Sequence, residues 1–179
     1  MTRLLDRPAT PVAIAEATKS SSQPRTLRRE AQRHVLLVRC GAEWFALNAA
    51  DVVHVSSVPR VHALPHRTTP AFRGVATIAG AVIPVVNVKA ILGLAEAQTT
   101  LARSPRMVQV GTSAASFAFE ADEVPGVLSI LLSSVRELPM TVEKAPRRIG
   151  TGLVTTTHGS VTLVDSALML AEFSRAMGA

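Results

Sequence analysis

An internal repeat sets the strongest limit on how this chain can fold. Two stretches match each other in order, at a shift of 72 residues in their first part and of 78 residues farther along. The matched positions include Phe45 with Phe117, Asp51 with Glu123, Gly74 with Gly152, Ile83 with Val161, and Asn87 with Asp165. A run of matches in the same order indicates a duplicated structural unit. We therefore predict two similar units, at about 34–94 and 105–173.

Each unit consists of short apolar runs separated by glycine, proline or polar pairs. Runs such as Val35–Val38 and Val82–Val88 recur roughly every ten residues and are rich in β-branched side chains. This spacing is typical of short antiparallel strands in a barrel or a sandwich. A unit of about 60 residues buries little surface alone, so we expect the two units to pack their apolar faces together.

A helix is predicted at the end of each unit. Asn87 and Asp165 each follow an apolar strand, and their side-chain oxygens can accept a hydrogen bond from a free backbone N–H. Gly93 is expected to end the first helix. The second helix is predicted from about Asp165 to Met177, with a buried side formed by Leu168, Leu170, Ala171 and Phe173.

Charge divides the chain into a tail and a domain. Residues 1–32 hold six basic and three acidic residues, which accounts for half of the net charge of +6. This segment is also rich in Ala, Pro, Ser and Thr. We predict a disordered basic tail over 1–32 and an ordered domain over 33–179. With 47% hydrophobic residues, the chain has the material for a core.

The sequence favours a reducing compartment. Cys40 is the single cysteine, so no intrachain disulfide can form. No apolar run reaches the roughly 18 residues that a membrane-spanning helix needs. The first residues lack the continuous apolar segment of a signal peptide. We predict a cytoplasmic protein without membrane insertion.

Candidate metal ligands do not form a convincing set. His62 and His66 have the spacing of two ligands on one helical face, but Pro65 between them argues against a helix. Surface histidines in a loop are the simpler interpretation. We predict no metal site and no cofactor.

Catalytic groups are equally sparse. Glu120, Asp122 and Glu123 form an acidic cluster that can in principle supply an acid/base pair. In the repeat, however, Glu123 matches Asp51, which favours a structural role in a turn. The chain also lacks the G-x-S-x-G elbow of a nucleophilic serine. We predict that the protein is not an enzyme and has no catalytic residue.

One central stretch resembles a known family. Phe72 to Val88, FRGVATIAGAVIPVVNV, resembles the signature region of the CheW-like family, the coupling proteins of bacterial chemotaxis. The opening Val35–Leu47 and the segment from Gly152 through Asp165 into the last helix are similar to other parts of that family, so the resemblance covers about 34–173. It implies a mainly β fold: two small SH3-like five-stranded barrels packed side by side, with short helices including a C-terminal one.

The resemblance also implies a function and a binding face. Members of the family are adaptors without catalytic activity, and they join the regulatory domain of a chemotaxis-type histidine kinase to the tip of a methyl-accepting chemoreceptor. The region that meets receptors corresponds here to the third strand and the glycine-flanked hairpin. The residues expected at this face are His54, Val55, Ile78, Ala79 and Gly80.

This face departs from the family pattern at two charged positions. Ala79 stands where the family usually has the arginine of Asn-Leu-Arg-Gly, and His54 stands where it usually has a glutamate. Without its guanidinium, position 79 cannot make a charge-assisted hydrogen bond to a receptor carboxylate. We expect weaker coupling to a conventional receptor tip, unaffected kinase docking, and binding by apolar burial with little salt dependence.

Two other functions stay open from the residues alone. The first is a small-barrel protein that binds nucleic acid through the basic tail, although its basic residues are not interleaved with stacking aromatics, so no nucleic-acid partner is predicted. The second is a self-associating structural module. Salt dependence separates nucleic-acid binding from the others, and a pull-down from the source cell separates the adaptor from the self-associating module.

Overall fold

The chain forms short strands with few helices. The computed structural model describes residues 31–65, 69–94, 104–111, 115–138 and 149–176. The strands are β1 (Gln32–Cys40), β2 (Glu43–Asn48), β3 (Val52–Ser57), β4 (Phe72–Ile78), β5 (Ala81–Val86), β6 (Arg106–Gly111), β7 (Ser116–Ala121), β8 (Glu123–Leu131), β9 (Gly150–Thr156) and β10 (Gly159–Val164). The helices are η1 (Ala49–Asp51), α2 (Val88–Leu92), η2 (Leu132–Ser134) and α4 (Ser166–Ala176). Residues 1–30 of the predicted tail lie outside the described residues.

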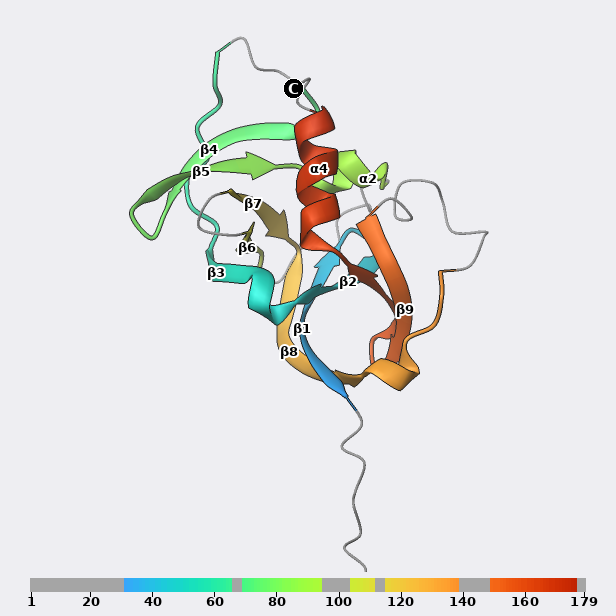
Figure 1. The fold of residues 1–179 in the computed structure, drawn as a ribbon. Coiled ribbons are helices and arrows are strands. Elements are labelled where there is room, and N and C mark those ends of the chain that lie inside the picture. Colours follow the sequence, from blue (N-terminus) through green and yellow to red (C-terminus); the bar gives the residue numbers. More distant parts are fainter. Residues whose placement is uncertain (1–30, 66–68, 95–103, 112–114, 139–148, 177–179) are drawn as a thin grey trace, which may run out of the picture.

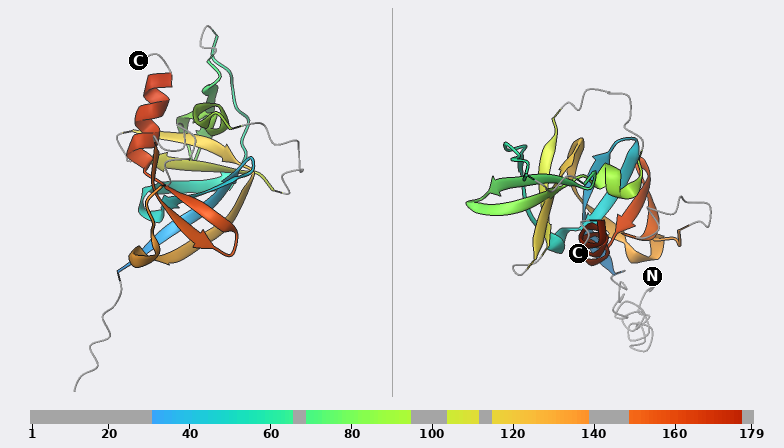
Figure 2. Two further views of the ribbon diagram at one scale, coloured as in Figure 1. Left: turned by 90° about the vertical axis from the view of Figure 1, so that its right-hand side faces the viewer. Right: turned by 90° about the horizontal axis from the view of Figure 1, so that it is seen from above.

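The strands form two five-stranded sheets that curl into barrels (Figure 1). The first barrel has the order β8-β1-β2-β10-β9, and the second has the order β3-β6-β7-β5-β4. A bridge between Arg136 and Leu153 links the chain after β8 to β9 across the first barrel. A bridge between His62 and Val75 links the chain after β3 to β4 across the second. Figure 2 shows the barrels side by side, with α2 and α4 at the same end of the molecule.

The two sequence repeats do not correspond to one barrel each. The first barrel takes β1 and β2 from the first repeat and β8, β9 and β10 from the second. The second barrel takes the complementary strands. Each repeat therefore crosses between barrels after its second strand, at η1 in one case and at Asp122 in the other.

Strand register agrees with the sequence repeat. In the second barrel, parallel strands β5 and β7 pair Val85 with Ala118, and in the first barrel β10 and β2 pair Leu163 with Ala46. The shifts of 78 and 72 residues convert one pair into the other. The close strand–loop approaches match as well: a Cβ at Gly74 would lie 2.1 Å from the His62 carbonyl oxygen, and one at Gly152 would lie 2.6 Å from a Val135 methyl. Neither site has room for a side chain.

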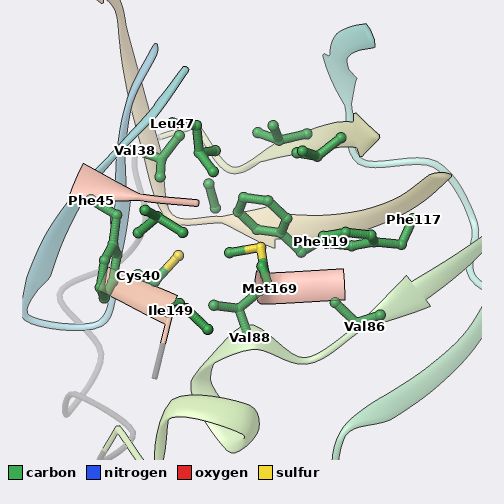
Figure 3. Packing of buried hydrophobic residues seen from close by; sticks show 14 of the residues in the cluster. Val38, Cys40, Phe45, Leu47, Val86, Val88, Phe117, Phe119, Ile149 and Met169 are labelled. Carbon is green, nitrogen blue, oxygen red and sulfur yellow. The ribbon is translucent and has the colours of Figure 1, made fainter. Parts of the chain in front are cut away.

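A shared apolar core joins the barrels (Figure 3). It lies between them and receives Leu36 and Val38 from β1, whereas Val35 and Leu37 of the same strand fill the interior of the first barrel. The pattern repeats in β6, where Val108 faces the shared core and Met107 faces the interior of the second barrel. Burial on both faces of the strand explains why Val35–Val38 is apolar without interruption. The packing observed is between two barrels that each contain strands of both repeats, and not between two separate repeat units as predicted.

The helices cover one end of the shared core. The Asn87 side chain accepts a hydrogen bond from the Ala90 N–H, and Gly93 ends α2 in a left-handed conformation, as predicted. Asp165 caps α4 by accepting hydrogen bonds from the N–H groups of Ala167 and Leu168, at 2.8 and 2.9 Å. The predicted buried side of α4 is wrong in part.

The buried apolar side chains in the described part of α4 are those of Met169 and Phe173, one turn apart, while Leu168 is 43% exposed and Ala171 is also exposed. Residues four apart share one face of a helix, so Phe173 and Met169 define the side that packs. The Phe173 ring lies 6.0 Å from that of Phe117 and 6.5 Å from that of Phe72.

Candidate docking surface

The predicted binding face begins on β3. His54 and Val55 are both exposed, and Val55 lies opposite Val108 of β6. A register irregularity between Val52 and His54 places an extra residue, Val53, in this strand. Successive side chains of a strand point to opposite faces, so His54 and Val55 do not point the same way.

The other predicted residues form the turn between β4 and β5. Ala79 and Gly80 are exposed and have φ of +47° and +84°. Two consecutive residues with positive φ are the geometry of a two-residue hairpin turn, for which Asn-Gly or Gly-Gly is the easiest sequence. Ile78 is 3% exposed and packs in the interior of the second barrel. Ile78 therefore supports the turn from inside and offers no side chain to a partner.

The second barrel holds both predicted segments on one body. Val58 and Val61, which follow β3, pack against the interior cluster that contains Ile78. The His62–Val75 bridge, with N–O distances of 2.8 and 2.9 Å, then fixes this connection against β4. Within the described part of the chain, no hydrogen bond joins His54 or Val55 to the turn at Ala79 and Gly80.

Two exposed apolar residues near this face were not predicted. Val82 is 69% exposed on β5, opposite Thr77 of β4, and Val53 is 54% exposed on β3. The signal for Val82 was present in the alternation of β5, where Ile83 and Val85 point inward and Val82 therefore points outward. The signal for Val53 was absent, because an irregular register does not show in the sequence.

The acidic cluster is engaged in structural contacts. The Asp122 carboxylate accepts hydrogen bonds from the Gly41 N–H at 2.6 Å and from the Lys89 ammonium at 2.8 Å. Glu120 pairs with Arg73 at 2.5 Å, and Glu123 pairs with Arg39 at 3.2 Å. Asp122 lies where the chain crosses from β7 to β8, so its contacts connect the crossover with α2 and with the β1–β2 turn. These pairings support the predicted structural role of the cluster.

Cys40 is not a reactive thiol in this fold. Its side chain is fully buried in the shared core. Burial, with a smaller contribution from the nearby Asp122 carboxylate, raises the pKa of the Cys40 thiol to about 12 from an ordinary 9.0. The thiolate that reacts with electrophiles or binds metals is therefore suppressed at neutral pH.

Within the described ranges, no group of three or more His, Cys, Asp or Glu side chains is placed to hold a metal ion. His62 is described, while His66, four residues farther along, lies outside the described residues. None of the described helices is long and apolar enough to cross a membrane.

Two five-stranded barrels that exchange strands and share one core define a two-barrel β module. The family model of the CheW-like domain matches residues 34–173. The chain therefore belongs to the CheW-like domain family, a family of non-enzymatic scaffold proteins.

Comparison with solved structures gives the same fold. The crystal structure of scaffolding protein TtCheW from Thermoanaerobacter tengcongensis is similar to this chain, with a TM-score of 0.64 and 18% sequence identity. The similarity covers 75% of this chain and 90% of the other. The predicted SH3-like two-barrel fold is confirmed. The search of curated proteins returned no match.

Proposed function

We propose that this protein is a non-enzymatic adaptor that docks the regulatory domain of a chemotaxis-type histidine kinase to receptors or other signalling partners. The observation that carries the proposal is the family match, which spans both barrels. The shared core supports it, because a body that holds two barrels in one orientation can hold two partners in a fixed geometry.

We further propose that the β3 strand and the β4–β5 turn form the receptor-like docking face. His54, Val55, Ala79 and Gly80 supply its exposed surface, and Ile78 supports the turn from the barrel interior. Since Ala79 carries no charge, a conventional receptor tip would lose a charge-assisted contact here. Kinase docking on other surfaces is unaffected by this change.

A capture experiment tests the adaptor function. The full chain is immobilised, and proteins retained from a lysate of the source cell are identified and then rebuilt as purified pairs. Binding of a purified kinase regulatory domain is the expected result. Recovery of this chain alone, with multimers in sedimentation velocity, would instead support the self-associating module. If the chain binds neither the kinase regulatory domain nor a second copy of itself, both the adaptor and the self-associating module are rejected.

A charge-restoring variant tests the docking face. His54→Glu with Ala79→Arg should strengthen binding to a conventional receptor tip and leave kinase binding unchanged. The matched control places the same charges on the first barrel, with Ser129→Glu and Thr157→Arg, at exposed positions on β8 and on the β9–β10 turn. If the wild type binds the tip as tightly as the double variant does, the proposed loss of receptor coupling is wrong.

A further inference from the structure

The region of the second barrel that contains the proposed face lacks acidic residues. No Asp or Glu occurs between Asp51 and Glu96, a stretch that contains β3, β4, β5 and α2. Among the described residues of this stretch, Arg73 and Lys89 have acidic partners from β7 and the β7–β8 crossover. Arg60, by contrast, is exposed and forms no ion pair within the described part of the chain.

Strand register adds a second cation to the β3 side. Arg106 lies opposite Ser57, two positions from the pair formed by Val55 and Val108. Residues two positions apart on a strand share a face, so Arg106 lies on the same face as Val55 and within reach of it as a diagonal neighbour. Arg106 is exposed and, like Arg60, forms no ion pair with a described residue.

The segment after β3 adds further exposed residues to the second barrel. Val58 and Val61 pack toward the barrel interior, while Arg60 and His62 are exposed. Leu64, two residues farther along, is 40% exposed. We use the term β3 face for six exposed residues of β3, of the segment after it and of the start of β6: Val53, Val55, Arg60, His62, Leu64 and Arg106.

The equivalent surface of the first barrel differs in charge. Arg136, which bridges to β9 as His62 bridges to β4, is followed directly by Glu137. Arg39, on the strand next to β8, is paired with Glu123. The first barrel also has exposed arginines without a described ion pair, Arg33 and Arg136, and exposed aliphatic residues on β8 and η2. It differs in that acidic residues accompany them, whereas the stretch between Asp51 and Glu96 has none.

We infer that the β3 face docks an acidic amphipathic protein segment, whose carboxylates meet Arg60 and Arg106 and whose apolar side covers Val53, Val55 and Leu64. This inference specifies the partner chemistry of the proposed docking function and rests on that function. Charges at the rim of an apolar patch steer a partner of opposite charge and select its orientation. A nucleic acid fits less well, because His62 is the single aromatic side chain among the six residues of the face, where a run of bases needs several to stack on.

The partner chemistry changes the salt dependence expected from the sequence. The five residues predicted from the sequence were expected to form a mostly uncharged patch, which led to the expectation of little salt dependence. The register brings Arg106 to this patch, and the chain after β3 brings Arg60. Binding through these exposed charges must weaken as added salt shortens the range of the electrostatic attraction.

Three designed helical peptides with one leucine face and different polar faces test the inference. The polar face carries glutamate in the first, glutamine in the second and lysine in the third, and binding to the full chain is followed by fluorescence anisotropy. We expect the glutamate peptide to bind about tenfold more tightly than the glutamine peptide at about 0.05 M salt, with the two nearly equal at about 0.5 M. The lysine peptide should bind most weakly. Equal binding of all three peptides at low salt would overturn the inference.

Paired variants locate the binding to the β3 face. Arg60→Gln with Arg106→Gln should lower the affinity for the glutamate peptide by about tenfold. The matched control, Arg33→Gln with Arg136→Gln, removes two exposed arginines from the first barrel and should change the affinity by less than about twofold. Equal losses of affinity in the two double variants would indicate non-specific electrostatic attraction and reject the site.

Two further measurements separate the remaining outcomes. A single-stranded DNA oligonucleotide that binds the wild type as tightly as the glutamate peptide, and loses affinity in the Arg60/Arg106 variant, would show a nucleic-acid surface and overturn the inference. Capture of the kinase regulatory domain is then measured for the same variant. If the variant still captures the kinase regulatory domain and the wild type binds all three peptides equally, the acidic partner is rejected and the adaptor function stands.

Discussion

Replacing Phe117 with alanine is the sharpest test of the shared core. Phe117 is fully buried on β7, a strand of the second barrel, and its ring packs 6.0 Å from that of Phe173. Truncation of a buried phenylalanine costs about 3–5 kcal/mol, from lost burial and the cavity left behind. At about 2–4 °C per kcal/mol for a chain of this size, the melting temperature should fall by roughly 6–20 °C.

The single tryptophan makes this experiment a test of coupling as well as of stability. Trp44 lies on β2 and packs against the interior cluster of the first barrel, away from the site of the substitution. Urea unfolding is followed by circular dichroism and by Trp44 fluorescence. If one core joins both barrels, Phe117→Ala should lower both midpoints equally. The control Val82→Ala, at a side chain 69% exposed on the same barrel, should leave both nearly unchanged. A Trp44 midpoint that stays at the wild-type value would refute a shared core.

Four further outcomes follow from individual contacts. Asp122→Asn should lower the free energy of unfolding by about 1–3 kcal/mol in urea titrations, because it removes the charge that holds Lys89 and the Gly41 N–H. Gly74→Ala should unfold at clearly lower urea than the wild type, since the new methyl meets a backbone carbonyl at 2.1 Å. Ala79→Gly should raise stability by about 0.5–1 kcal/mol by relieving a positive φ, and an unchanged melting temperature would contradict that strain. Between a pH near 9 and one near 12, the wild type should lose stability relative to Cys40→Ala as pH rises. The reason is that the thiol ionises in the unfolded chain first and stays protonated in the fold, where its pKa is about 12.

Much of the fold could be predicted from the sequence because the signals for its helices and strands lie in short segments of the chain. The caps at Asn87 and Asp165, the stop at Gly93 and the short apolar strands each depend on residues close in the chain. The exchange of strands between barrels was not predictable in this way. Leu36 and Leu37 look alike in a sequence, yet one fills the shared core and the other fills the interior of the first barrel. Only long-range pairing decides which barrel a strand joins.

The candidate site was harder to predict than the fold. The exposure of a strand residue depends on which face of the sheet its side chain points to. Ile78 belongs to the stretch with family resemblance, but the inward side of β4 buries it. Val82 is exposed because it lies on the outward side of β5. Arg106 is distant from the predicted face in sequence, and its place beside Val55 follows from the pairing of β3 with β6.

The exchange of strands also bears on how the proposed adaptor would work. Because each barrel contains strands from both repeats, the repeats cannot separate without breaking strand pairs in both barrels. The two barrels cannot separate without opening the shared core. The crossover at Asp122 is held further by contacts to Gly41 and Lys89. Surfaces on the two barrels therefore keep a fixed relative orientation, while their exposed residues are free to differ. The stretch of the second barrel without acidic residues, between Asp51 and Glu96, is such a difference, so partner choice can change there at little cost to the core that holds the partners in place.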